Sequence, residues 1–206
     1  MSDDKVKAKL IVTDTGPLIT LAVGEALDYL LYPDIPIYIP DAVLHEATTK
    51  NKALGAESIL AWVQEHTDDV HMVATQAYAD FNTMRDISPT HRERDLGERA
   101  AIETIRYVVK LKPDERAVLI TEDDWTIRGP YIIAPGDRER VIPITTHDFL
   151  TGLEKIGRIN STNEVYRRIE IAGRNASRSS TLDEQGEGAR EAITAMLGKF
   201  PTPAKS

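Results

Sequence analysis

Short apolar runs and longer amphipathic segments alternate along most of the chain. The runs at residues 10–12, 37–39, 117–120 and 141–144 predict buried strands, and residues 70–75 are compatible with a strand or an extended link. Each run is bounded by a turn or by a segment of helical length, a pattern typical of strands joined by helical crossovers. The alternation therefore predicts an α/β fold with a mainly parallel sheet.

The spacing of apolar residues within the longer segments predicts the connecting helices. Ile59, Leu60 and Val63 are expected to face the core, with Trp62 at least partly buried, and Gly24 is expected to weaken or split the first helix. Helices on both faces of the sheet would make a three-layer α/β/α sandwich. The predicted helices cover residues 18–31, 42–47, 56–65, 76–84, 95–111 and 146–156.

The composition changes after Gly157, which divides the chain into a domain at residues 1–158 and a helical or flexible C-terminal extension at residues 159–206. A capping-box pattern, Ser161 to Glu164, opens a helix that is expected to end near residue 172. Residues 175–188 resemble a linker in composition, and residues 189–197 could form one more short helix.

The composition limits the cellular compartment in which the protein is expected. No apolar run approaches the ~18 residues of a membrane-spanning helix, and the charged start, Met1 to Lys5, lacks the apolar core of a secretion signal. The absence of cysteine excludes disulfides and thiolate metal sites. We therefore expect a cytoplasmic protein.

The formal net charge of −8 argues against nucleic-acid binding through bulk electrostatics. Acidic residues dominate before Lys155, whereas basic residues outnumber them from there onward. Binding to RNA would need metal ions that offset the acids, or a local basic strip. Arg167, Arg168 and Arg174 form such a strip, which indicates either a solvated helix face or contacts with RNA or an acidic partner.

Carboxylates recur where predicted strands end and where the following helices begin. The acids in these positions are Asp14, Glu46, Asp95, Glu98, Asp123 and Asp124. Each alone has an ordinary explanation as a helix cap, a turn residue or a solvated carboxylate. Together at one sheet edge they would repel one another unless a cation lay between them. Carboxylates without His or Cys suit Mg²⁺ or Mn²⁺, ions that activate water and stabilise phosphoryl transition states in many nucleases.

Four segments, in this order, resemble the successive motifs of PIN domains, most closely those of the VapC-like toxin ribonuclease branch. The resemblance covers roughly residues 8–158. The segments are Ile11-Val12-Thr13-Asp14-Thr15-Gly16-Pro17-Leu18-Ile19, Ile39-Pro40-Asp41-Ala42-Val43 with Glu46, Asp95-Leu96-Gly97-Glu98-Arg99-Ala100-Ala101-Ile102, and Val118-Leu119-Ile120-Thr121-Glu122-Asp123-Asp124.

The resemblance implies a metal-dependent endoribonuclease, often the toxin of a type II toxin–antitoxin pair, commonly a homodimer and held inactive by a cognate antitoxin protein. Carried over residue by residue, it assigns catalysis and the binding of Mg²⁺ or Mn²⁺ to Asp14, Glu46, Glu98 and Asp123. The secondary candidates are the neighbouring acids Asp95 and Asp124 and the hydroxyl residues Thr15 and Thr121. The resemblance does not explain the extension after residue 158.

Other functions fit parts of the sequence. Asp14-Thr15-Gly16 is also the active-site tripeptide of aspartic proteases, but that mechanism needs two such carboxylates, on an all-β scaffold. A haloacid-type phosphatase needs a second Asp where Gly16 stands. A PIN-like protein that binds partners without catalysis is compatible with the sequence. The five histidines show no metal-ligand spacing.

Overall fold

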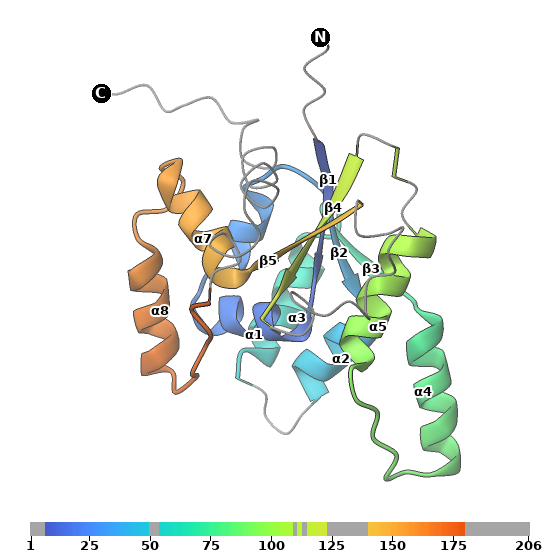
Figure 1. The fold of residues 1–206 in the computed structure, drawn as a ribbon. Coiled ribbons are helices and arrows are strands. Elements are labelled where there is room, and N and C mark those ends of the chain that lie inside the picture. Colours follow the sequence, from blue (N-terminus) through green and yellow to red (C-terminus); the bar gives the residue numbers. More distant parts are fainter. Residues whose placement is uncertain (1–6, 50–53, 109–110, 113–114, 123–139, 180–206) are drawn as a thin grey trace.

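The structure is a computed structural model that describes residues 7–49, 54–108, 111–112, 115–122 and 140–179 (Figure 1). The described strands form one five-stranded sheet, in the order β3-β2-β1-β4-β5, and every described strand pair is parallel. The strands are β1 (Lys7–Thr13), β2 (Ile37–Pro40), β3 (Val70–Val73), β4 (Glu115–Thr121) and β5 (Val141–Thr145).

Helices lie along the chain between β1 and β4 and follow β5. They are α1 (Thr15–Val23), α2 (Asp41–Thr49), α3 (Ala56–Glu65), α4 (Gln76–Ile87), α5 (Leu96–Glu103), α7 (Thr146–Lys155) and α8 (Thr162–Ile171). A 3₁₀ turn, η1 (Leu27–Leu31), follows α1, and a π-helical turn, η2 (Thr104–Val108), extends α5. In the described part of the chain, no helix has the length and apolar character needed to cross a membrane.

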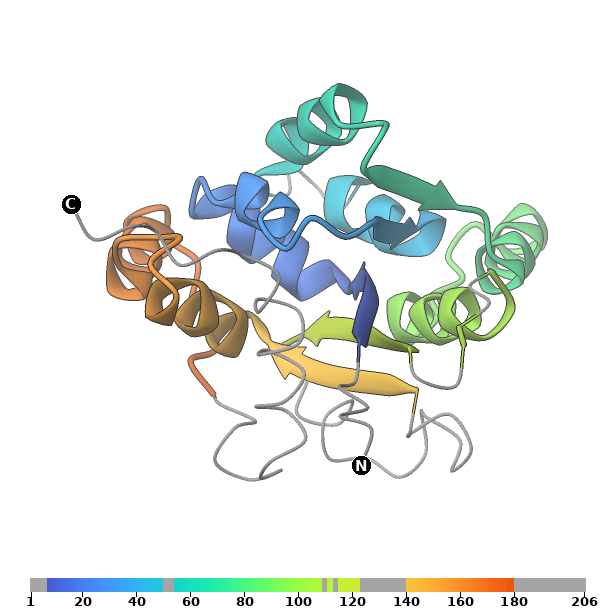
Figure 2. The same cartoon turned by 90° about the horizontal axis from the view of Figure 1, so that it is seen from above.

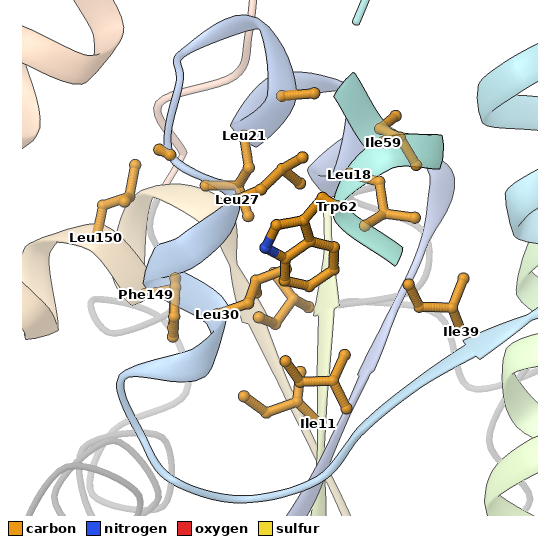
Figure 3. Packing of buried hydrophobic residues seen from close by; sticks show 14 of the residues in the cluster. Ile11, Leu18, Leu21, Leu27, Leu30, Ile39, Ile59, Trp62, Phe149 and Leu150 are labelled. Atoms are coloured by element: carbon orange, nitrogen blue, oxygen red, sulfur yellow. The ribbon is translucent and has the colours of Figure 1, made fainter. Parts of the chain in front are cut away.

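Both faces of the sheet are covered by buried side chains and helices. Successive residues of a strand point to opposite faces, so neighbouring residues of β1 belong to different cores. Ile11 of β1 lies with Ile39 and Ile120 in the larger core, which α1, α3, α7 and α8 help to close (Figure 3). Val12 lies with Leu119 in a smaller core, against α5. The predicted α/β fold with a mainly parallel sheet is confirmed, and helices on both faces are compatible with a three-layer arrangement (Figure 2).

The connectivity of the sheet reverses between β1 and β4. From β1 the chain moves outward through β2 to β3, and it then crosses to β4 on the other side of β1 and continues to β5. In open parallel sheets, the crevice at the carboxyl ends of the strands that flank such a reversal is the usual place for a ligand. Asp14, which follows Thr13, and Glu122, which follows Thr121, therefore lie where a site is expected.

Several helices differ from the sequence-based expectation. Helix α4 continues to Ile87, past its predicted end at residue 84, and α5 ends at Glu103, where η2 takes up part of the span predicted to reach residue 111.

The first helix ends at Val23, because Gly24 caps it and η1 takes up the rest of the predicted span. In α3, Leu60 is 42% exposed rather than inward, whereas Trp62 is 5% exposed. Ile59, Trp62 and Val63 share the i, i+3, i+4 stripe that faces the sheet, and Leu60 falls outside it.

The described part of the C-terminal extension packs into the larger core. Ser161 caps the start of α8, and its hydroxyl accepts a hydrogen bond from the Glu164 N–H at 3.3 Å, as the capping pattern predicts. Tyr166 and Ile169 of α8 are buried in the same cluster as Ile11. The division at residue 158 thus does not separate two cores, and the helix expected at residues 189–197 lies outside the described residues.

Gly24 allows this packing. A Cβ on Gly24 would stand 2.9 Å from Val165 Cγ1 and 3.0 Å from Ile169 Cγ1, so a larger residue would push α8 away from α1. The side chain of Arg168 reinforces the contact, because its Nε donates a hydrogen bond to the Gly24 carbonyl at 2.8 Å. The end of α1 and the middle of α8 therefore fit together at a position where only hydrogen is accommodated without movement.

Replacing Ile169 by alanine is expected to lower the free energy of unfolding by about 2–5 kcal/mol, because the side chain is fully buried between α8 and the core. Ile171→Ala, two residues along the same helix at a position 73% exposed, should change it by less than about 0.5 kcal/mol. Urea unfolding of both variants measures the difference. Equal effects would show that α8 does not contribute to the core.

Candidate functional site

Asp14 stands at the reversal point of the sheet, between the end of β1 and the start of α1. Its backbone N–H donates to the Ile120 carbonyl of β4 at 3.0 Å, which fixes it between the two central strands. Its side chain caps α1 by accepting a hydrogen bond from the Thr15 N–H at 2.6 Å. With 8% of its surface exposed, Asp14 is a buried acid that is held by the fold itself.

Glu46 reaches the same place from α2. Its Oε2 accepts a hydrogen bond from the Thr15 hydroxyl at 3.0 Å, so Thr15 holds Asp14 with its backbone and Glu46 with its side chain. The start of α2 is fixed by Asp41, whose Oδ1 accepts hydrogen bonds from its own helix at Ala42 N (2.8 Å) and from the hydroxyl of Thr75, the N-cap of α4 (2.7 Å). The two predicted acids are thus brought together by one threonine.

Gly97, in the first turn of α5, lies against this pair. A Cβ at Gly97 would stand 3.1 Å from Glu46 Oε2, 3.2 Å from Asp14 Oδ1 and 3.2 Å from Thr15 Oγ1. Three oxygen atoms from α1, α2 and the end of β1 therefore surround one point at the surface of α5. Glycine permits this close approach, and the residue after it is Glu98.

The electrostatic state of Asp14 reflects this environment. Burial raises the pKa of its carboxyl group from 3.8 to about 7, and the negative charges of Glu98 and then Glu46 act in the same direction. Hydrogen bonds from the Thr15 N–H and the Thr121 hydroxyl favour the charged form and lower the pKa in part. Glu98 is therefore close enough for its charge to act on Asp14, as the sequence predicts for acids at one sheet edge.

Thr121 ends β4 beside Asp14, and its buried hydroxyl lies 3.4 Å from Asp14 Oδ2, a long hydrogen bond. Asp95 directly precedes α5 and is exposed, with its backbone in the left-handed region at φ 56°, and its side chain makes no capping hydrogen bond to the described residues of α5. Asp123 and Asp124 lie outside the described residues. The structure thus brings together Asp14, Glu46, Thr15 and Thr121, with Glu98 acting through its charge.

The predicted basic strip is divided between the open surface and partly buried contacts with the rest of the protein. Arg167 is exposed. Arg168 bonds to the Gly24 carbonyl of α1, and Arg174 donates to groups at the start of α1 and the end of β4. Two of the three arginines therefore connect the extension to the rest of the protein, a role that helical spacing alone does not reveal.

Gly97 and Glu122 take part in the site region although the sequence analysis gave neither a role of its own. A glycine inside a helical pattern is a signal of close backbone approach, and Gly97 shows it. Glu122 accepts hydrogen bonds from the Thr146 hydroxyl and from Arg174, both at 3.1 Å. Its partners come from distant segments, so no local pattern could have identified them.

The oxygen atoms at the site are ligands of the kind that a hard divalent ion binds. The residues at the site offer carboxylate and hydroxyl oxygens, which Mg²⁺ and Mn²⁺ prefer, and a cation would offset the repulsion that acts on Asp14. Among the residues that the structure describes, no three His, Cys, Asp or Glu side chains form a group with metal-binding geometry. The predicted fourth acid, Asp123, is outside that set.

Comparison with known proteins does not assign the chain to a protein family. It matches no known family model, no curated protein and no solved structure. The described α/β scaffold with its parallel sheet differs from the all-β scaffold that the aspartic-protease mechanism requires. The function must therefore be inferred from the site and its surroundings.

Asp14→Asn is expected to stabilise the metal-free protein at neutral and alkaline pH. The pKa of Asp14 is about 7 in the folded protein and 3.8 in its ordinary state, so the native state keeps a proton that the unfolded chain releases. This contribution to stability is complete below about pH 4 and is lost as pH rises through 7. At pH 8 the variant should gain up to about 4 kcal/mol over the wild type.

Thermal or urea unfolding between pH 4 and pH 8, in the presence of a chelator, measures this difference. Asp68→Asn serves as the control, because Asp68 is exposed. It should reproduce the wild-type pH dependence. A wild-type profile that matches Asp14→Asn at every pH would contradict the raised pKa of Asp14.

Proposed function

We propose that the protein is a metal-dependent endoribonuclease of the PIN type that cleaves RNA phosphodiester bonds. The observation that carries the proposal is the convergence of Asp14, Thr15 and Glu46 on Gly97, at the reversal point of a parallel sheet. The motif resemblance and the strand-end position of Asp14 support the same function.

The proposal gives the acids and Thr15 different roles. Asp14, Glu46 and Glu98, with Asp123 as the predicted fourth, would hold Mg²⁺ or Mn²⁺. When bound, such an ion lowers the pKa of a water molecule and stabilises the charge of a phosphoryl transition state. Thr15 orients two of the acids through its N–H and its hydroxyl. The raised pKa of Asp14, about 7 without a metal, would fall when a cation binds, because the positive charge favours the ionised carboxylate.

The acidic surroundings explain why a cation belongs to the proposal. RNA carries negative charge, and a site that contains Asp14, Glu46 and Glu98 would repel it. A divalent ion would reduce this repulsion and draw a phosphate toward the acids. A toxin role, a cognate antitoxin and a homodimer stay predictions that come from the resemblance.

Cleavage of a structured RNA tests the proposed activity. In the presence of Mn²⁺ or Mg²⁺, the wild type should cleave internal phosphodiester bonds, and a chelator should abolish cleavage. Asp14→Asn and Glu46→Gln should each reduce the rate on the order of a hundredfold or more, because each removes a charge from the site. Glu57→Gln, at an exposed position of α3, is the matched control and should retain wild-type activity.

A non-catalytic RNA-binding or protein-binding role would give a different result. The wild type would then cleave RNA no faster than Asp14→Asn at any metal concentration. A minor nuclease contaminant is excluded when the two proteins are purified in parallel and only the wild type cleaves.

Metal binding can be measured without RNA. Mg²⁺ or Mn²⁺ should raise the melting temperature by several degrees, since an ion at 100 times its Kd stabilises the native state by about 2.7 kcal/mol. Glu46→Gln should reduce this shift, whereas Glu57→Gln should retain it. An unchanged melting temperature at millimolar concentrations of both ions would contradict a metal site.

A further inference from the structure

Arg174 joins two segments that carry the candidate site. It lies just beyond α8, where the chain turns back toward α1 (Figure 1). Its Nε donates to Thr20 Oγ1 at 2.8 Å, and its Nη2 donates to the Gly16 carbonyl at 3.1 Å. The same Nη2 lies 3.1 Å from Glu122 Oε2. One side chain therefore connects the start of α1 with the end of β4.

Both connections are adjacent to residues of the site. Gly16 lies two positions after Asp14, and Glu122 directly follows Thr121. The ion pair of Arg174 and Glu122 is shielded from solvent, with side-chain exposures of 22% and 14%. A shielded, charge-assisted hydrogen bond holds its geometry more firmly than a surface ion pair.

The pairing also controls the charge next to the acids. Glu122 Oε2 would lie 3.1 Å from a Cβ at Gly16, so this carboxylate sits against the first turn of α1. Without a cation this negative charge would lie unpaired against the first turn of α1. The Thr146 hydroxyl binds the other oxygen, Oε1, at 3.1 Å, and Arg174 supplies the positive charge.

The rest of the segment after α8 is fixed as well. The Tyr166 hydroxyl donates to the Ser177 carbonyl at 2.9 Å, and the Thr145 hydroxyl at the end of β5 donates to the Ser179 carbonyl at 2.9 Å. Arg178 lies over the Tyr166 ring, 4.7 Å from its centroid. These contacts hold the backbone from which Arg174 extends.

We infer that Arg174 is a positioning residue of the candidate site, which it serves by fixing the start of α1 relative to the end of β4. This inference rests on the proposed function, because a positioning residue needs a site to position. Arg174 lies outside the four motif segments. The fixed relation keeps the Asp14 and Thr121 side chains in contact and keeps the charge of Glu122 paired. It gives the C-terminal extension a role in activity as well as in packing.

Arg174→Met, with Arg168→Met as its matched control, tests the inference in the full-length chain. Both arginines tie the extension to α1, but Arg168 does so at Gly24, at the end of the helix away from the site. Arg174→Met should lower kcat for RNA cleavage about 10- to 100-fold with KM changed less than about twofold, as expected for a residue that orients the site without touching the substrate. Arg168→Met should retain kcat even where its melting temperature falls by the same amount.

The double variant Glu122→Gln with Arg174→Met adds a second check. Since the charge of Glu122 needs Arg174, removing both should restore part of the kcat that Arg174→Met loses. Equal kcat, equal melting temperature and equal backbone exchange in Arg174→Met and Arg168→Met would overturn the inference and leave Arg174 a purely structural residue.

Amide hydrogen exchange separates this inference from the proposed function. Arg174→Met should speed exchange in residues 15–20 and 116–121, whereas Arg168→Met should leave these two segments as in the wild type. If the wild type cleaves no RNA with either metal, the proposed function fails, and this comparison alone decides whether Arg174 fixes the two segments. Equal exchange in both variants then overturns the inference.

Discussion

The burial of the Asp14 carboxyl group among other acids is the constraint on which the site depends. A pKa of about 7 means that ionising Asp14 in the folded protein opposes folding by up to about 4 kcal/mol. Typical domains are stable by only about 5–15 kcal/mol, so the repulsion is a large term. A fold that keeps Asp14, Glu46 and Glu98 at one place is more stable with a proton or a cation there. This electrostatic demand links the architecture to the proposed chemistry.

The strands and the position of Asp14 follow from local pattern. Val118 to Ile120 is an uninterrupted apolar run, which is what a central parallel strand with two covered faces requires. The carboxyl ends of parallel strands lie at one edge of the sheet, so acids that follow the apolar runs of these strands are expected to lie close together. The convergence of Asp14 and Glu46 was predictable for this reason, and the structure brings both onto Thr15.

What could not be predicted depends on contacts between distant segments. The pairing of Arg174 with Glu122 joins residues 52 positions apart, and a charge pattern along α8 resembles that of an ordinary solvated helix. Leu60 was expected in the core because it is apolar, but the orientation of α3 on the sheet leaves it exposed and buries Trp62 more fully than the pattern indicates. The fit of Gly97 against three oxygens likewise appears only when α1, α2 and α5 are packed together.

The docking of α8 on α1 links the last described helix to the first one. The ribosome synthesises a chain from its N-terminus, so α1 leaves the exit tunnel long before the residues that cover it. The apolar surface around Gly24 stays open until Val165 and Ile169 have left the exit tunnel, and Arg174 follows a few residues later. The nascent protein therefore completes the edge of its candidate site only after all four motif segments have been made.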